Sequence, residues 1–344
     1  MSIEKIGAEG FLHLAEKIPV CDVRSPSEFN AGHIPGATNI PIFSDKEREI
    51  IGIKYKKEGR IPAIKEGLDL AGPHMSQKLD QALKIAADNQ LLVHCWRGGM
   101  RSEAMAWLFS MAGINVHVLD GGYKSYRHFI LEKLSEKRKM IVLGGLTGSS
   151  KTHLLNHLKG LGQQVIDMEG LANHKGSAFG SLGQLPQPST EQFANLLYDE
   201  WKRSDPEAPV WLEDESRNIG TVFMPENLYE NMQKAPAIII MMDVKTRLPR
   251  LVEEYSKFPR ESLITSILKI SKRLGGDNTR DAISAVETGD FAKAIEIALL
   301  YYDKAYMFGL TRKSSENKIY ITTDTDNIGE NAVRLLEAAE KLRW

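Results

Sequence analysis

The chain has 344 residues, of which 42% are hydrophobic and 26% charged, a balance typical of a globular protein long enough for two domains with separate cores. Its net charge of −1 at pH 7 excludes a general electrostatic attraction to nucleic acid, so any contact with RNA must come from local basic patches. Two cysteines exclude a disulfide framework, and the lack of a signal-peptide core or a bilayer-spanning apolar run indicates a cytoplasmic protein without membrane contacts.

Strand-like and helix-like segments alternate along the first part of the chain. Residues 20–24 predict a short strand, and residues 25–29 predict a helix start in which Glu28 completes a capping box. Further strands are expected at residues 38–41 and 116–122. This alternation predicts a parallel α/β sheet, a fold that places its ligands at the carboxyl ends of the strands.

The stretch with the clearest chemistry is residues 94–102, which follows an apolar run at 91–93 and precedes a helical pattern at 102–111. A strand that ends in a glycine-rich turn and opens into a helix forms an anion cradle of backbone N–H groups, strengthened by the helix dipole. Cys95 is expected to attack from this cradle as a thiolate, and Arg101 to close the ring with a fork of donors. A buried structural cysteine is the alternative, but it does not explain why glycines and arginines cluster there.

This domain resembles the rhodanese family in four segments that together cover most of residues 1–125: residues 22–29, 32–37, 95–101 and 119–122. The resemblance implies that Cys95 carries a sulfur or selenium atom as a persulfide or perselenide. The loop from Cys95 to Arg101 has seven residues, whereas simple sulfurtransferases have six. The longer loop is similar to that of dual-specificity phosphatases of the same fold, so phosphatase chemistry is an alternative for this domain alone.

Two sets of charged residues in this domain have two interpretations each. Asp22 and Arg24 serve the reactive site or form a structural ion pair at the strand end. Lys54, Lys56 and Lys57, in a segment that mixes basic and aromatic residues, contact a phosphate backbone or lie on a solvated helix face.

A second motif follows a charged helical linker at residues 126–139. An apolar strand from residue 140 leads into a glycine-rich loop, a Lys-Thr pair and a helix, which is the P-loop arrangement. The phosphate-binding residues are expected to be Gly145, Thr147, Gly148, Ser149, Ser150, Lys151 and Thr152. Ser150 stands where the motif has glycine, so this position needs a negative φ or accepts strain.

Acidic residues mark the metal side of this P-loop domain, which we place at residues 140–244 with its last strand and helix at 313–344. An apolar strand ends in Glu213, Asp214 and Glu215, where the acidic motif of P-loop proteins belongs. We expect Thr152, Asp214 and Glu213 to hold Mg²⁺; an exposed acidic turn is the alternative.

A helical insertion is expected at residues 245–312. Basic residues outnumber acidic ones over its first half, and Arg247, Arg250, Lys272 and Arg273 are candidates for RNA contacts with tyrosines nearby. A solvated helix face is the alternative. The expected class is therefore α/β, with an N-terminal rhodanese-like parallel-sheet domain and a C-terminal P-loop α/β domain that carries a helical insertion.

The pairing of these two domains, together with residues 174–180, 185–189 and 213–217, resembles the tRNA 2-selenouridine synthase family over nearly the full length. The resemblance implies that wobble 2-thiouridine in tRNA is alkylated on sulfur by geranyl diphosphate, and that selenium from selenophosphate then replaces the S-geranyl group. It implies that Arg97 and Arg101 hold the selenophosphate oxyanion before Cys95 presents selenium. The partners implied are tRNA and an enzyme that supplies selenophosphate; the oligomeric state stays open.

The chemistry also predicts what the P-loop does. Diphosphate leaving an allylic carbon needs its developing charge neutralised, which the P-loop and Mg²⁺ supply without ATP hydrolysis. The alternative function is a rhodanese-type sulfurtransferase or phosphatase-like domain coupled to a P-loop NTPase that acts on RNA. A non-enzymatic RNA-binding adaptor is a further alternative, disfavoured by the presence of both Cys95 and Lys151.

Overall fold

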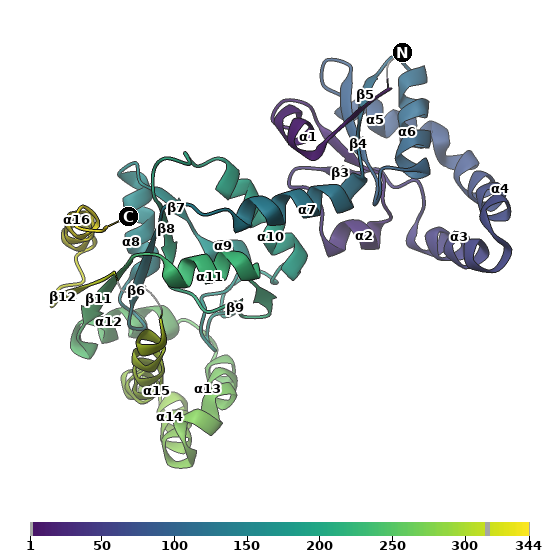
Figure 1. Cartoon of the computed structure of the whole chain (residues 1–344). Coiled ribbons are helices and arrows are strands. Elements are labelled where there is room, and N and C mark those ends of the chain that lie inside the picture. The colour runs from purple at the N-terminus through teal and green to yellow at the C-terminus, as the bar shows by residue number, and fades with distance from the viewer. Residues whose placement is uncertain (1–2, 314–316, 344) are drawn as a thin grey trace. The chain divides into compact units, whose positions relative to one another are not determined.

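The computed structural model describes residues 3–313 and 317–343, and the chain divides into two compact units, Met1–Lys133 and Leu134–Trp344. The division falls within helix α7 (Gly122–Ser135), so most of the helical part of the segment expected as a linker belongs to the first unit (Figure 1). Among the described helices, none has both the length and the apolar character needed to cross a bilayer.

The first unit contains a five-stranded sheet in which every strand pair is parallel, in the order β1-β5-β4-β2-β3. Its strands are β1 (Ile3–Ile6), β2 (Val20–Asp22), β3 (Thr38–Asn39), β4 (Gln90–His94) and β5 (Asn115–Leu119). Strand β4 is central, and Val93 lies between Cys21 and Val118 of its neighbours. Because helices cover both faces of such a sheet, its central strand is a continuous apolar run, and Leu91 and Leu92 are fully buried.

The helices of this unit are α1 (Ala8–Leu14), α2 (Pro26–Ala31), α3 (Asp45–Glu58), α4 (Arg60–Ala71), the 3₁₀ turn η1 (Gly72–His74), α5 (Met75–Ile85), α6 (Met100–Met111) and α7. The predicted capping box at the start of α2 is confirmed, since the Ser25 backbone N–H donates to Glu28. Helices α3 and α4 pack against each other as a hairpin, seen at the right of Figure 1.

The second unit contains another parallel five-stranded sheet, in the order β12-β11-β6-β8-β7. Its strands are β6 (Met140–Gly145), β7 (Gln164–Ile166), β8 (Val210–Glu213), β11 (Ala237–Met242) and β12 (Lys318–Thr323), and a separate antiparallel pair is formed by β9 (Asn218–Ile219) and β10 (Val222–Phe223). The chain leaves β6 toward β7 on one side and later places β11 on the other. The carboxyl end of β6 is therefore the switch point at which such sheets bind ligands.

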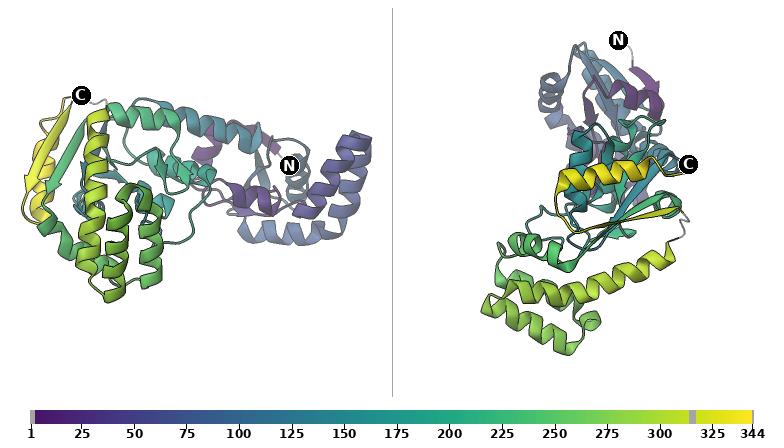
Figure 2. Two further views of the ribbon diagram at one scale, coloured as in Figure 1. Left: turned by 90° about the horizontal axis from the view of Figure 1, so that it is seen from below. Right: turned by 90° about the vertical axis from the view of Figure 1, so that its left-hand side faces the viewer.

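The helices of the second unit are α8 (Lys151–Gly160), α9 (Met168–Ala172), α10 (Thr190–Lys202), α11 (Glu226–Lys234), α12 (Val244–Tyr255), α13 (Arg260–Leu274), α14 (Gly276–Thr288), α15 (Phe291–Arg312) and α16 (Ile328–Ala339). The predicted helical insertion is confirmed as α12 to α15. Helices α13, α14 and α15 lie side by side in both views of Figure 2 and share an apolar core of their own. The predicted α/β class with two parallel sheets is also confirmed.

Candidate active sites

The loop after β4 is fixed in shape by backbone contacts with the start of α7. The N–H groups of Tyr123 and Lys124 donate to the carbonyls of Cys95 and Trp96, at 2.8 and 3.0 Å. A Cβ on Gly122, whose φ is +61°, would lie 2.4 Å from the Cys95 carbonyl oxygen. This close approach of two backbone segments is available only to glycine, so Gly121 and Gly122 at the start of α7 belong to the reactive loop as much as the loop's own residues do.

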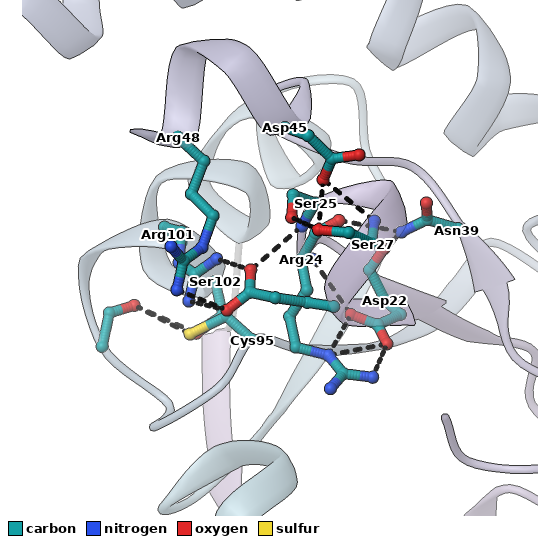
Figure 3. Close-up of polar contacts among 12 residues, drawn as sticks. Asp22, Arg24, Ser25, Ser27, Asn39, Asp45, Arg48, Cys95, Arg101 and Ser102 are labelled. Atoms are coloured by element: carbon teal, nitrogen blue, oxygen red, sulfur yellow. Dashed lines mark hydrogen bonds and ion pairs between the residues drawn. The ribbon is translucent and has the colours of Figure 1, made fainter. Parts of the chain in front are cut away.

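The Cys95 thiol is recessed at the bottom of this loop. Only 3% of the residue is exposed, and Sγ lies 3.2 Å from the hydroxyl oxygen of Ser102, which is itself buried (Figure 3). That hydroxyl is 3.0 Å from the carbonyl oxygen of Gly99. The sulfur therefore has a hydroxyl beside it, but it is less open than the sequence leads one to expect of a nucleophile.

The arginine that should close the ring is turned to a carboxylate. Arg101 donates to both oxygens of Glu28 at 2.6 and 3.4 Å, and Arg48 from α3 donates to the same carboxylate at 3.2 Å (Figure 3). Burial opposes ionisation of Glu28, but the hydrogen bond and charge of Arg101, followed by Arg48, outweigh it and lower the pKa of Glu28 to about 2. The charge of Arg101 is thus neutralised by Glu28, and its expected role in holding an oxyanion stays a prediction. Arg97 is exposed at the rim of the loop.

Asp22 and Arg24 form the structural ion pair that was one of the two interpretations. Both side chains are fully buried, with Arg24 Nη2 2.6 Å from Asp22 Oδ2 and 2.7 Å from the Gly32 carbonyl oxygen. The guanidinium lies 3.8 Å from the ring centre of Tyr123. This pair joins the end of β2 to the turn after α2 and to the start of α7.

In the second unit, the P-loop runs from the end of β6 to the start of α8. Lys151 Nζ lies 3.2 Å from the Gly145 carbonyl oxygen and 3.6 Å from Glu213 Oε1. Ser150 has φ +63° and ψ +25°, the left-handed conformation that the glycine of this motif usually adopts. The serine is therefore accommodated by strain, and Arg250 donates to its hydroxyl.

Three buried carboxylates gather beside this loop. Oxygens of Glu169, Glu213 and Glu215 lie within 4.8 Å of one another, and the Thr152 hydroxyl donates to Glu169 and Glu213 at 3.3 and 3.4 Å. Burial and the charge of Glu213 raise the pKa of Glu169 to about 8, and burial with the charges of Glu213 and Glu169 raises the pKa of Glu215 well above its usual range. Oxygen donors at this spacing, which resist ionisation without a cation, fit Mg²⁺.

Asp214 is not part of this cluster, which corrects its expected role as a metal ligand. Its carboxylate is 2.7 Å from Nζ of Lys313, whose side chain is 3% exposed, and accepts from the Tyr306 hydroxyl at 3.3 Å. Tyr306 in turn accepts from the Gly145 N–H at 2.7 Å. Asp214 thus ties the end of α15 to the P-loop strand.

The P-loop and the three carboxylates line a cavity of about 540 Å³. Part of its lining, which we call the tyrosine wall, is aromatic and consists of Tyr255, Tyr301, Tyr302 and Tyr306 from α12 and α15. A narrow void of about 40 Å³ shares Thr147, Leu251, Tyr255 and Tyr302 with this cavity and extends among apolar side chains of α13, α14 and α15. The phosphate-binding loop therefore faces both an acidic cluster and an apolar recess.

Comparisons with known proteins agree with this two-part design. The family model described as the tRNA 2-selenouridine synthase AAA domain matches residues 138–335, and the rhodanese-like domain model matches residues 9–129. The chain belongs to the tRNA 2-selenouridine synthase family. Proteins named tRNA 2-selenouridine synthase are 34% identical in Sulfurovum sp. (strain NBC37-1), covering 86% of this chain and 90% of that protein, and 35% identical in Shewanella loihica, covering 88% and 89%. A crystal structure of the N-terminal domain of a putative ATP/GTP binding protein from Clostridium difficile 630 is 36% identical over 38% of this chain and 99% of its own, with a TM-score of 0.34.

In this member of the tRNA 2-selenouridine synthase family, one basic residue of the insertion does not face solvent as an RNA contact must, and a second is only partly exposed. Arg247 is buried and donates to Asp303 and to the Thr147 carbonyl, so its expected role is wrong. Its hydrogen bond to Thr147 stabilises the P-loop from within the protein interior. Arg250 lines the P-loop cavity and pairs with Asp326.

The other basic candidates for RNA contact in this family member differ in their exposure and in whether their side chains already have partners. Lys54 pairs with Glu66 at 2.6 Å, while Lys56 and Lys57 are exposed on α3. Lys272 and Arg273 are exposed at the end of α13, where Arg273 donates to Tyr301. These exposed residues remain predictions for RNA contact.

Four functional candidates of this family member escaped sequence analysis. Glu28 was recognised only as a helix cap, and nothing in the sequence places it against Arg101. Ser102 was part of the reactive stretch without a role. Glu169 has no local signal, and Glu215 lies beyond the end of β8, where a turn in which its N–H donates to the Glu213 carbonyl at 2.9 Å places it beside Glu213.

Proposed function

We propose that this protein is a tRNA-modifying transferase that converts wobble 2-thiouridine to 2-selenouridine through an S-geranyl-2-thiouridine intermediate, using geranyl diphosphate and selenophosphate. Membership in the family and the names of the relatives support the overall reaction. The observation that carries the geranyl step is that the phosphate loop and several tyrosines line the same cavity of about 540 Å³, a lining suited to a diphosphate with a hydrocarbon tail.

In the first step, the sulfur on C2 of the base attacks C1 of geranyl diphosphate, and the carbon–oxygen bond breaks with its electron pair leaving on diphosphate. Lys151 and the loop N–H groups are positioned to receive the developing charge. Glu169, Glu213, Glu215 and Thr152 would hold Mg²⁺, which supplies Lewis-acid neutralisation of the diphosphate. The tyrosine wall and Leu251 would keep water from the allylic carbon.

In the second step, selenide released from selenophosphate attacks the Cys95 sulfur of a mixed disulfide between Cys95 and a small thiol, and the thiolate leaves, so that Cys95 carries selenium as a perselenide. This selenium attacks C2, and the bond from C2 to the geranyl-bearing sulfur breaks so that geranyl thiolate leaves. A thiolate then attacks the Cys95 sulfur and breaks its bond to selenium, which leaves selenium on the base and restores the mixed disulfide. Replacing the thiocarbonyl by a thioether makes the leaving group better, which gives the geranylation its purpose. The Ser102 hydroxyl lies within reach of the reacting sulfur.

The test is mass spectrometry of nucleosides from 2-thiouridine-containing tRNA incubated in a glutathione thiol–disulfide buffer with the protein, Mg²⁺, geranyl diphosphate and selenophosphate, each omitted in turn. We expect the geranylated nucleoside when selenophosphate is omitted, and no product without geranyl diphosphate. Cys95→Ala should accumulate the geranylated nucleoside, with Cys21→Ala as the matched control cysteine. Lys151→Ala should stop geranylation, with Lys159→Ala, exposed on the same helix, as its control.

Two results would refute the proposal. One is tRNA-dependent ATP turnover by a protein that ignores geranyl diphosphate, which would favour the NTPase alternative. The other is 2-selenouridine formation by Cys95→Ala, which would remove the carrier role from the first unit.

A further inference from the structure

A large groove between α3 and α4 opens beside the reactive loop of the first unit. We call it the α3–α4 groove; its volume is about 800 Å³, and aliphatic and aromatic side chains of the two helices and the segment before them form its walls. Arg97, Met100 and Arg101 of the reactive loop form one end. Volume and lining are those of a site for a small, largely apolar ligand.

The groove keeps apolar side chains in contact with water. Ile53 is 46% exposed, Leu68 66% and Met100 51%, and every residue of α3 retains some exposure. Single exposed apolar side chains are common on protein surfaces, but several that line one groove beside a reactive loop indicate a binding surface.

A glycine in the middle of α3 keeps the groove wide. Gly52 lines the groove, and no atom lies within 4 Å of the position that a Cβ would take. Glycine is disfavoured inside a helix, and here no packing contact requires it. Any larger side chain at this position would occupy the groove.

Two contacts join the groove to the reactive loop. Arg48 of α3 shares Glu28 with Arg101, and Arg60 at the start of α4 lies 3.9 Å from the sulfur of Met100. The helical hairpin is thus held against the loop that carries the nucleophile. A ligand in the groove lies next to the residues that surround Cys95.

We propose that the α3–α4 groove binds the geranyl chain of S-geranyl-2-thiouridine within tRNA while C2 of that base is presented to Cys95. This inference rests on the proposed function. The geranyl sulfur is bonded directly to C2, so the ten-carbon chain must lie within its own length of the reactive loop during selenation. The exposed apolar walls match the chain, and Arg48, Lys56 and Arg60 on the same lining match the phosphates of the RNA that bears it.

The test supplies pre-formed intermediates, so that the P-loop unit has no part in it. Anticodon stem-loops carrying either S-geranyl- or S-methyl-2-thiouridine at the wobble position are incubated with the full chain, selenophosphate and a glutathione thiol–disulfide buffer, and kcat/KM for 2-selenouridine formation is measured. Gly52→Leu fills the groove; displacing about two carbons of the chain lowers kcat/KM for the geranylated RNA by about tenfold. The S-methyl RNA should be processed at the wild-type rate.

Gly10→Leu is the matched control, because Gly10 is also a helical glycine with open space around it but lies on α1, away from the groove. Leu68→Gln, which changes an exposed position without burying a polar group, gives a second reading should Gly52→Leu fold poorly. Equal losses on both RNAs, or none, in a folded Gly52→Leu or Leu68→Gln protein would overturn the groove assignment alone. A wild-type protein that fails on the geranylated RNA would overturn the proposed function and the groove assignment together.

Discussion

The carboxylate cluster makes a prediction about the stability of the second unit without metal. The pKa of Glu169 is raised to about 8 by burial and by Glu213, against a usual value of 4.5. A folded-state pKa above the unfolded one means that stability is fully present below pH 4.5 and is lost as the pH rises through 8. At 1.36 kcal/mol per pH unit, this one group lowers the free energy of unfolding by about 3 kcal/mol at pH 7 and about 4 kcal/mol at pH 8, but by only about 1 kcal/mol at pH 5.

The perturbation is Glu169→Gln, which keeps an oxygen that the Thr152 hydroxyl can reach and removes the titration. In EDTA we expect the variant to gain on the order of 3 kcal/mol over the wild type between pH 5 and pH 8, a rise in Tm of about 6–12 °C for a unit of this size. Adding Mg²⁺ should stabilise the wild type at pH 8 and the variant much less, because binding to the folded state alone raises stability.

The assay is thermal and denaturant unfolding of both proteins at the two pH values, with and without Mg²⁺. Glu296→Gln is the control, since Glu296 is exposed on α15 of the same unit. If the wild type and Glu169→Gln show the same pH dependence in EDTA, burial and Glu213 do not raise the pKa of Glu169 in the folded protein. The argument for a cation at the cluster then fails.

Three further predictions concern the glycine backbone beside the Cys95 loop, the strained Ser150 of the P-loop, and the ion pair of Asp214 with Lys313. Gly122→Ala should cost at least about 3 kcal/mol in unfolding free energy, whereas Gly113→Ala, with φ +86° but open space, should cost about 1–2 kcal/mol; similar values would contradict the backbone contact. Ser150→Ala should be less stable than Ser150→Gly by about 1–2 kcal/mol in denaturant unfolding, because both lack the hydroxyl and only alanine keeps the left-handed strain. Asp214→Asn should lose about 3–5 kcal/mol by stranding the buried charge of Lys313, yet keep its Mg²⁺ affinity by calorimetry; weakened Mg²⁺ binding would restore Asp214 as a ligand.

The sequence was sufficient to predict the two sheets and the two anion-binding loops, because each loop is a local signal. An apolar strand, a glycine-rich turn and a helix occur in one continuous stretch around Cys95 and again around Lys151, and the structure places both at the carboxyl end of a central strand. Side-chain partners that come from elsewhere in the chain carry no such signal. Glu28 and Glu169 reach their sites only through the packing of whole helices.

Of two wrong assignments, only the second had a signal in the pattern of the chain. Strand β8 ends at Glu213, and in the turn that follows the Glu215 N–H donates to the Glu213 carbonyl at 2.9 Å, so that Glu215 joins Glu213 while Asp214 pairs with Lys313. In α12, Arg247 stands four positions before Leu251, on the same buried face. Counting charges over the insertion treated that arginine as a surface residue, although its helical position placed it in the interior.

The recess of the Cys95 sulfur protects it in a protein that, under the proposed function, also handles an alkylating agent. An allylic diphosphate transfers its carbon chain to soft sulfur, and an open thiolate would compete with the base for it. With 3% of Cys95 exposed and Ser102 beside its sulfur, the empty thiol is a poor target for such self-inactivation. Burial of Cys95 thus protects its sulfur from alkylation, whereas the sulfur of 2-thiouridine must be alkylated for the reaction to proceed.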